Sequence, residues 1–302
     1  MDNRHSQSLT ALKAGGWLAR ARASFFAWRA YDVTSHAVVG WHVLLCAIAV
    51  LNIALWSLAA IAVVRAPTLS HAVADPTIRL QLLLSAGYVL GCAFRSVLPV
   101  YDIPRVVLID TPLSNVIVGR SVATVAELCF AAQWALMLHR MALMSHSGPG
   151  QTVALLIVPL IVIAEACSWY AVLTTAQRAH AAENSIWGLS AALVVAGLLM
   201  TAPQRVAGLS WPVIVWCVGG AAYVAYIFLF DVPAYWSRWR VDQSTGRRHL
   251  SIAEGVRDVC GRRTVSYRWE VWKNEVLWMS LYFSVGVWSS VSLVYASMTL
   301  AG

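Results

Sequence analysis

Residues 115–143 read NVIVGRSVATVAELCFAAQWALMLHRMAL, and this stretch decides the fold. At ~1.5 Å rise per residue, a helix over it is long enough to cross about 30 Å of hydrocarbon. Residues 151–175 form a second such stretch, and each stretch holds one glutamate near its centre, Glu127 and Glu165. An ionised carboxylate at that depth costs roughly 2.5–3.5 kcal/mol unless it is paired, protonated, bound to a metal or exposed to a cavity. The two stretches therefore predict a polar site inside a bundle of transmembrane helices.

The whole chain has the composition of a polytopic membrane protein. Of 302 residues, 59% are hydrophobic and only 12% are charged. Apolar runs long enough to span the bilayer occur in seven places. They cover residues 37–64, 79–100, 115–143, 151–175, 184–203, 209–231 and 275–299. We therefore expect an all-α integral membrane protein, a seven-transmembrane-helix bundle in contact with the lipid bilayer.

The arginines and lysines are distributed unevenly between the two sides of the predicted bundle. With the N-terminus inside, only Arg65, Arg79, Arg140 and Arg205 of the 22 basic residues fall on the outer side. Cytoplasmic segments of membrane proteins are enriched in basic residues. The sequence therefore predicts a cytosolic N-terminus and an outside C-terminus, in a bacterial cytoplasmic (inner) membrane. The net charge of +8 is then explained by topology, and no nucleic-acid partner is expected.

The predicted organisation has four parts, which differ in charge and hydropathy. They are a cytosolic basic, amphipathic N-terminal segment over 1–36, transmembrane helices 1–6 over 37–231, a cytosolic basic loop over 232–274, and transmembrane helix 7 with a short outer tail over 275–302. Within the loop, Ser251 and Glu254 have the spacing of a capping box, and Gly261 offers a helix stop. The loop is therefore predicted to hold a short helix near 252–260.

Further polar residues lie in the cytosolic half of the predicted spans. Arg120, Thr124 and Glu127 are separated by four and three residues, so they share one face of a helix. A second stripe at the start of the fifth span consists of His180, Glu183 and Asn184. A charged stripe that faces lipid has a high free-energy cost. Both stripes are therefore predicted to point into a shared cavity that opens to the cytosol.

The residue types in these stripes favour a metal centre as the first hypothesis. Carboxylates and imidazoles bind iron and manganese, and the candidate ligands are Glu127, Glu165, His180, Glu183 and His42. Bundle di-metal sites carry Glu-x-x-His twice, whereas this chain has one such pair in reverse order. The hypothesis is a metal-dependent oxidoreductase or oxygenase that acts on a small lipophilic or amphipathic substrate and receives electrons from a cytosolic donor. Arg95 or Arg120 would orient the substrate.

Three other hypotheses use the same residues. In a metal-free isomerase or cyclase, Glu127 or Glu165 would be the general acid or base, while Arg95 or Arg120 holds an anionic group of the substrate. A transporter would also place Glu and Arg inside the membrane, but no internal repeat relates the first three spans to the last three. In a purely structural arrangement, the arginines would neutralise the glutamates and fix the packing of the helices.

Several classes of protein are excluded by residues that the chain lacks. The only lysines, Lys13 and Lys273, lie outside the predicted spans, so a retinal Schiff base has no candidate. No histidine pair has the HxxH, HxxxH or HExxH spacing of histidine-box desaturases and zincins. A Walker loop and a haem-attachment motif are also absent from the sequence.

Overall fold

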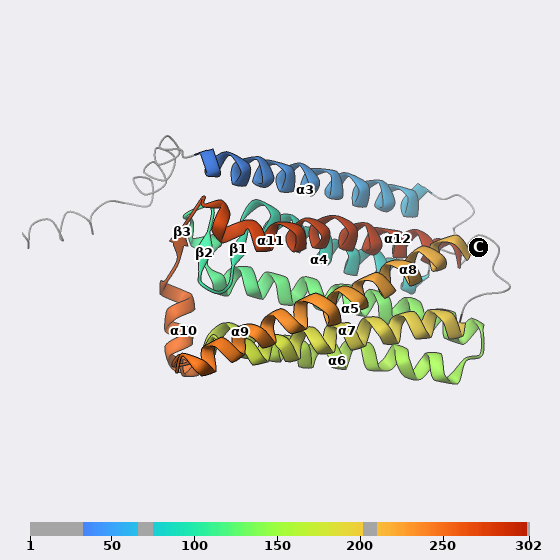
Figure 1. The fold of residues 1–302 in the computed structure, drawn as a ribbon. Coiled ribbons are helices and arrows are strands. Elements are labelled where there is room, and N and C mark those ends of the chain that lie inside the picture. Colours follow the sequence, from blue (N-terminus) through green and yellow to red (C-terminus); the bar gives the residue numbers. More distant parts are fainter. Residues whose placement is uncertain (1–32, 66–74, 202–209, 301–302) are drawn as a thin grey trace, which may run out of the picture.

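The computed structural model describes residues 33–65, 75–201 and 210–300. Figure 1 shows the long helices lying side by side in one bundle. The first five are α3 (Val33–Arg65), α4 (Pro76–Val97), α5 (Val116–Met144), α6 (Gly148–Thr174) and α7 (Gln177–Thr201). They are followed by α8 (Ser210–Tyr226), α9 (Val232–Ser244), α10 (Ile252–Gly261), α11 (Trp269–Leu281) and α12 (Val287–Thr299). Within the described ranges, seven helical segments are long and apolar enough to cross a membrane, as the sequence predicts.

Two parts of the predicted organisation remain predictions. Residues 1–32 of the N-terminal segment and residues 301–302 of the outer tail lie outside the described residues. The sidedness of the bundle also rests on the distribution of basic residues alone.

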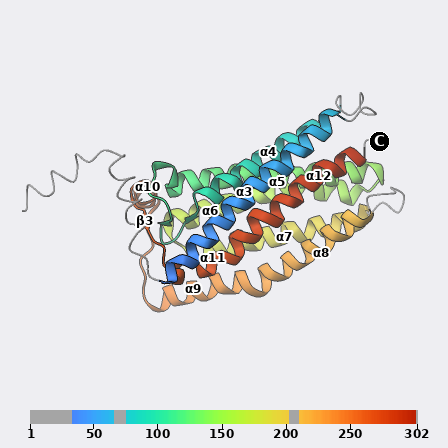
Figure 2. The same ribbon diagram turned by 90° about the horizontal axis from the view of Figure 1, so that it is seen from above.

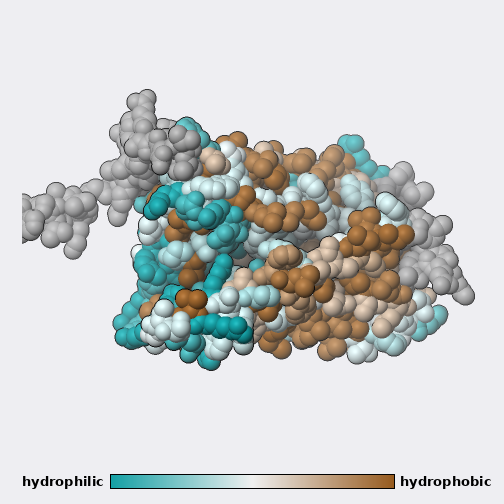
Figure 3. All heavy atoms as spheres, viewed as in Figure 1, coloured by the Kyte–Doolittle hydropathy of each residue, from teal (hydrophilic) through white to brown (hydrophobic). Residues whose placement is uncertain are grey.

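Apolar side chains cover most of the surface along the bundle. Figure 3 shows them over the middle of the molecule, whereas hydrophilic residues gather at the end where α10 lies. Exposed large apolar residues on the spanning helices include Val43, Leu83, Leu155, Leu199 and Val218. A soluble monomer rarely exposes a continuous apolar patch of more than a few hundred Å². This surface is that of an integral membrane protein, with lipid as its surroundings.

The sixth and seventh spanning helices extend further than the sequence predicts. The sixth was expected to end at residue 231, but a π-helical turn, Ile227–Asp231, joins α8 directly to α9. The wider turn precedes Pro233, whose ring and missing N–H would otherwise disturb the helix. The seventh begins at Trp269 instead of 275 and contains a second π-helical turn, Tyr282–Gly286, between α11 and α12. The predicted 232–274 loop is therefore limited to the connection 245–268.

Neighbouring helices in the chain are also neighbours in space from α3 to α7. The last spanning helix returns to the bundle, where α12 packs against α4 and α11 against α3. Figures 1 and 2 both show the α11–α12 helix lying between α3 and the α8–α9 helix. On the other side, α9 packs against α7. Helices α5, α6 and α7 are therefore positioned to bring side chains from three spans into one interior.

At one end of the bundle, the two connections 98–115 and 245–268 fold together, and we call them the polar cap. Their strands form a small sheet in the order β1 (Val100–Tyr101), β2 (Val106–Val107) and β3 (Thr264–Val265). Strand β2 is antiparallel to β1 and parallel to β3. These strands were not predicted, because a two-residue strand has no measurable alternation of apolar and polar residues.

Arg105 ties the polar cap to α6. Its guanidinium is fully buried, with Nε 3.0 Å from Asp258 Oδ2 in α10. Its Nη2 donates to the carbonyl oxygen of Val172 in α6 at 2.6 Å, and Nη1 donates to that of Asp102 at 2.6 Å. A buried guanidinium needs such partners for each of its N–H groups. One arginine therefore joins three segments that are far apart in the sequence.

Helix α10 begins as its sequence predicts. The Ser251 hydroxyl accepts from the Glu254 amide, and the Glu254 carboxylate accepts from the Ser251 amide, which is a complete capping box. The hydrogen bonds that the Ser251 amide and hydroxyl donate to the carboxylate lower the pKa of Glu254 below its ordinary value. Gly255 faces α6 so closely that a Cβ there would overlap the carbonyl oxygen of Leu173. The predicted short helix is confirmed, and a glycine allows its close packing against α6.

Candidate functional site

Three glutamates from three helices converge on one arginine inside the bundle. Nη2 of Arg120 lies 2.9 Å from Glu127 Oε2, 2.6 Å from Glu165 Oε2 and 3.9 Å from Glu183 Oε1. All four residues are between 4% and 8% exposed. We call these four residues the glutamate cluster. Its charges are removed from water, so their interactions are strong and an unpaired charge among them is costly.

The positions of these side chains follow from helix geometry and from the order of the helices. Arg120 and Glu127 both come from α5, seven residues apart, which places them on one face. Glu165 comes from the middle of α6, and Glu183 from the second turn of α7. Because α5, α6 and α7 pack consecutively, these faces meet. The structure thus brings together the two glutamates that the sequence singled out.

Hydrogen bonds fix the carboxylates of the cluster in place. The Thr124 hydroxyl donates to Glu165 Oε2 at 2.6 Å and accepts from Trp169 Nε1 at 3.0 Å. The Tyr282 hydroxyl donates to Glu127 Oε1 at 3.0 Å. Thr124 lies on the predicted polar face of α5, but Tyr282 was not predicted. Its position in a π-helical turn of the last span carries no signal in the spacing of polar residues.

The second predicted stripe reaches the cluster only in part. His180 Nδ1 lies 2.8 Å from Glu183 Oε2, so the imidazole extends the cluster towards the polar cap. The ring of Tyr235 in α9 lies against the imidazole, with 5.1 Å between ring centroids. Asn184 instead donates to the carbonyl oxygen of His180 in its own helix. Two of the three residues in this stripe therefore belong to the site.

Several polar atoms near the cluster have no partner in the described part of the chain. They are Glu165 Oε1, Arg120 Nε and Ser168 Oγ, all buried. Ser168 is one turn from Glu165 on α6. Buried polar atoms are normally hydrogen-bonded, and an orphaned group in a native site calls for a ligand or a water molecule. The cluster therefore has unused hydrogen-bonding capacity on the α6 side.

Two predicted site residues lie elsewhere. His42 Nε2 is 3.0 Å from the carbonyl oxygen of Val97 and 3.6 Å from Cys46 Sγ, at the contact between α3 and α4. Arg95 donates to the carbonyl oxygen of Val100 at 3.3 Å. Neither takes part in the ion pairs of the glutamate cluster that the structure records. The structure therefore places His42 at the α3–α4 contact and does not bring it together with the other predicted ligands.

The predicted iron or manganese site does not fit the glutamate cluster. Among the described residues, no three His, Cys, Asp or Glu side chains are arranged to hold a metal ion. The point where the carboxylates converge is filled by the guanidinium of Arg120, which bonds an oxygen of both Glu127 and Glu165. A metal ion would have to displace this fixed cation and would be repelled by it. The donor set is that of a salt-bridge network.

A second group of ionisable residues lies between the cluster and the polar cap. Glu275 of α11 is within electrostatic range of Arg238 and Asp231, which belong to the α8–α9 helix. Burial and the nearby charge of Glu275 raise the pKa of Tyr101 in the polar cap. Asp231 and Arg238 are seven residues apart and share a helix face. The predicted helix end at residue 231 left Arg238 in a loop, so this shared face was not predicted.

An aromatic wall extends from the cluster to the surface between the last two spans. Trp278 of α11 stacks on Tyr223 and Tyr226 of α8, with ring centroids 6.3 and 6.1 Å apart. Trp278 also packs against Tyr282, with ring centroids 5.6 Å apart. Tyr282 therefore belongs both to this wall and, through Glu127, to the glutamate cluster.

Farther from the polar cap, a neutral polar network crosses the bundle. Gln133 Nε2 donates to Gln81 Oε1 at 3.1 Å, and Ser290 Oγ donates to Gln133 Oε1. Ser290 also lies 3.0 Å from the hydroxyl of Ser85. Gln133 is six residues beyond Glu127 on α5, so the network lies about 9 Å along the helix axis from the cluster.

The fold and site define a helical integral membrane protein with a buried arginine–glutamate network. Comparison with known proteins adds no family to this description, since no family model, curated protein or solved structure matches the chain.

Proposed function

We propose that the chain is a membrane-embedded enzyme that performs metal-free acid–base chemistry on a small lipophilic or amphipathic substrate, as an isomerase or cyclase does. One observation carries the proposal: three buried carboxyl groups share one guanidinium. Fully ionised, these four groups would hold two uncompensated negative charges in a site shielded from water. Such a site relieves the excess charge by taking up protons. It therefore supplies groups that hold and release protons.

The metal-dependent oxidation that the sequence favours receives less support from the geometry. Arg120 occupies the centre of the carboxylates, and His42 is not among them. An arginine between several carboxyl groups instead suits acid–base chemistry, in which those groups must differ in proton affinity. Glu165 receives hydrogen bonds from Arg120 and Thr124. The hydroxyl group that donates to Glu127 is instead that of Tyr282. Unequal surroundings are what separate an acid from a base in paired carboxylates.

In the proposed reaction, a carboxylate of the cluster accepts a proton from one atom of the substrate. A protonated carboxyl group of the same cluster returns a proton to another atom. A double bond or a ring bond is rearranged, and the composition and oxidation state of the substrate do not change. Glu165 is the best candidate to touch the substrate, because its Oε1 is buried without a partner among the described residues.

The aromatic wall supports a lipophilic substrate. Trp278 and Tyr282 offer flat apolar surfaces that lead to the carboxylate of Glu127. Aromatic rings bind apolar groups without needing a fixed hydrogen-bond pattern. Because basic residues favour the cytoplasmic side, we propose that the polar cap lies in the cytosol and that the substrate enters from the inner leaflet of a bacterial cytoplasmic membrane.

Product analysis tests this function. Membrane lipids from cells that express the full chain are expected to contain a species that is absent with Glu165→Gln and has the same mass as its precursor. Chromatography coupled to mass spectrometry measures it. Glu270→Gln is the matched control, since this carboxylate is 64% exposed and lies outside the cluster. A product that differs from its precursor by an oxygen atom or two hydrogens would overturn the proposal in favour of oxidation.

Metal analysis gives a second prediction. The purified full chain is expected to contain iron and manganese well below one equivalent, because Arg120 fills the point where the carboxylates meet. Elemental analysis of wild-type protein and of Glu165→Gln measures both contents. One or two equivalents in the wild type that disappear in the variant would show a metal centre and reject acid–base catalysis without metal.

A second candidate function is transport, and the neutral network favours it. Gln81, Gln133 and Ser290 continue a polar path from the glutamate cluster towards the opposite end of the bundle. Buried glutamates and arginines also mark ion paths in membranes. Sealed vesicles containing the purified chain distinguish the two functions. Unaltered lipophilic compound or protons accumulating on the far side would indicate a transporter, whereas an isomerised product supports the enzyme.

A further inference from the structure

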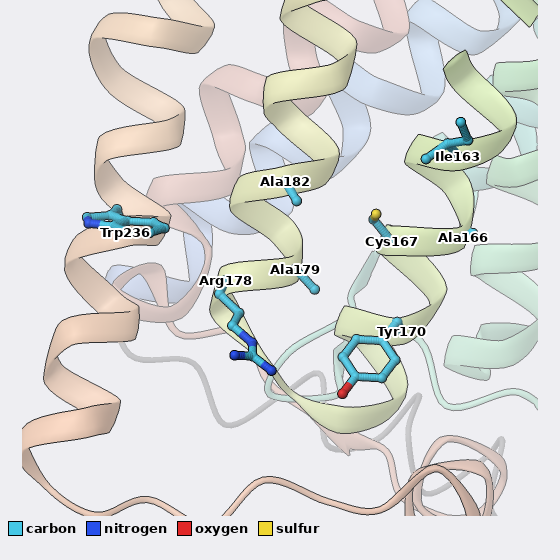
Figure 4. Close-up of a pocket in the computed structure, with 8 residues that line it drawn as sticks. All are labelled: Ile163, Ala166, Cys167, Tyr170, Arg178, Ala179, Ala182 and Trp236. Atoms are coloured by element: carbon cyan, nitrogen blue, oxygen red, sulfur yellow. The ribbon is translucent and has the colours of Figure 1, made fainter. Parts of the chain in front are cut away.

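A groove on the outer surface of the bundle runs along the contact between α6 and α7. Its volume is about 550 Å³. It is lined by Ile163, Ala166, Cys167, Tyr170, Arg178, Ala179, Ala182 and Trp236. Figure 4 shows these side chains on α6, α7 and α9, at the end of the bundle where α6 and α7 are connected. This groove faces the surroundings and is separate from the glutamate cluster, since Glu165 is buried while the adjacent Ala166 is exposed.

The floor of the groove is apolar and is formed by small side chains. Ala179 and Ala182 of α7 lie opposite Cys167 of α6, and Ile163 lies farther along α6 (Figure 4). Larger residues at these positions would fill the depression between the two helices. An acyl chain fits such a surface, because its methylene groups need only apolar contact.

Charge and polar groups are confined to one end of the groove. The guanidinium of Arg178 and the hydroxyl of Tyr170 are directed towards this end in Figure 4. Arg178 is exposed and makes no ion pair or hydrogen bond recorded among the described residues, although acidic residues occur nearby on α7. Trp236 of α9 borders the groove and is 44% exposed. Exposed Trp and Tyr rings at a span end are typical of the headgroup region.

We propose that this groove binds one anionic phospholipid from the leaflet at the polar-cap end, with its phosphate on Arg178 and an acyl chain along Ala179, Ala182 and Ile163. The position of the cation fits this occupant. Arg178 is the second residue of α7, next to the connection between two spanning helices, which is the depth of lipid phosphates. A guanidinium forms bidentate hydrogen bonds with phosphate oxygens.

The occupant is a lipid rather than a helix of a partner protein. A helix lying along the groove would cover the unpaired guanidinium of Arg178 without a phosphate to neutralise it, which is unfavourable inside a membrane. Positive pockets between spanning helices on the cytoplasmic side are a common site for anionic headgroups. The proposal does not depend on the reaction in the glutamate cluster, because the groove lies on the exposed face of α6, opposite the face that carries the buried Glu165.

Native mass spectrometry of the purified full chain tests the proposal, with phosphatidylglycerol as the probe and phosphatidylcholine as the neutral reference. The wild type is expected to retain one phosphatidylglycerol in preference to phosphatidylcholine. Arg178→Gln is expected to weaken phosphatidylglycerol binding about fivefold, since one basic residue near the membrane surface contributes ~1 kcal/mol. Ala182→Phe, which fills the floor of the groove, is expected to reduce binding of the retained lipid to a similar extent.

Arg240→Gln is the matched control, because it removes one exposed charge at the same end of the molecule but outside the groove. It should leave the retained phosphatidylglycerol unchanged. Equal losses in Arg178→Gln and Arg240→Gln would overturn the proposal, since they would show general attraction of lipids to a basic surface. Unchanged binding in Ala182→Phe would overturn it as well, because the acyl chain would then lie elsewhere. Thermal unfolding of each variant confirms that it is folded.

Discussion

Replacing Arg120 with glutamine is expected to lower the free energy of unfolding by about 3–5 kcal/mol, the loss observed when one partner of a buried ion pair is removed. The variant leaves Glu127, Glu165 and Glu183 without the cation that all three approach. Their mutual repulsion is then uncompensated in an interior with little water. Chemical unfolding of the purified chain in mixed micelles measures the change.

Arg95→Gln is the matched control for Arg120→Gln. It removes the same charge from a spanning helix, but its recorded contact is one carbonyl oxygen at 3.3 Å, so a loss of about 1–2 kcal/mol is expected. Adding Glu165→Gln to Arg120→Gln should recover part of the stability, because one of the stranded carboxylates is neutralised. Equal losses for the two arginine variants, with no recovery in the double variant, would contradict the central role of Arg120.

Replacing Gly255 with alanine is expected to lower the free energy of unfolding by about 1–3 kcal/mol, as overpacking of a close contact does. The added Cβ would overlap the carbonyl oxygen of Leu173, and the backbone of α6 cannot move aside as a flexible side chain can. Helix α10 must then shift away from α6. Because Asp258 of α10 binds the buried guanidinium of Arg105, the shift also strains that contact.

Gly261→Ala tests whether the effect of Gly255→Ala arises from packing. Gly261 ends the same helix, and a Cβ there would meet nothing within 4 Å. Its replacement should change stability by less than about 1 kcal/mol, and in the stabilising direction if helix propensity dominates. Thermal unfolding of both variants gives the comparison. A larger loss for Gly261→Ala than for Gly255→Ala would show that α10 does not dock as described.

The sequence was sufficient to predict what depends on local composition and on helix periodicity. Apolar runs predict the spanning helices, and the depth of Glu127 and Glu165 within two of them predicts an interior site. The capping box predicts α10 because all its groups lie within four residues. The seven-residue spacing of Arg120 and Glu127 likewise predicts a shared face, which the ion pair between them occupies.

Contacts between distant segments could not be predicted in the same way. Tyr282 reaches Glu127 across 155 residues of sequence, and a tyrosine in an apolar run gives no sign of its partner. The sixth span is longer than the apolar run 209–231 predicts, because a π-helical turn carries the helix past Asp231 and Pro233 into a more polar segment. The role of Arg105 is hidden for a similar reason, since a basic residue in a connection is normally exposed.

The π-helical turns have a mechanical consequence when they are considered with the polar cap. Parallel pairing of β2 with β3 and the contacts of Arg105 restrain the segment between α9 and α11, so these helices cannot slide freely at that end. Helices bend most readily at π-helical turns. The points where the last two spans can bend are therefore Ile227–Asp231 and Tyr282–Gly286, beyond the end that the polar cap restrains. Tyr282 lies in the second of these turns, so the hydrogen bond that it donates to Glu127 starts from the most readily bent point of the last span.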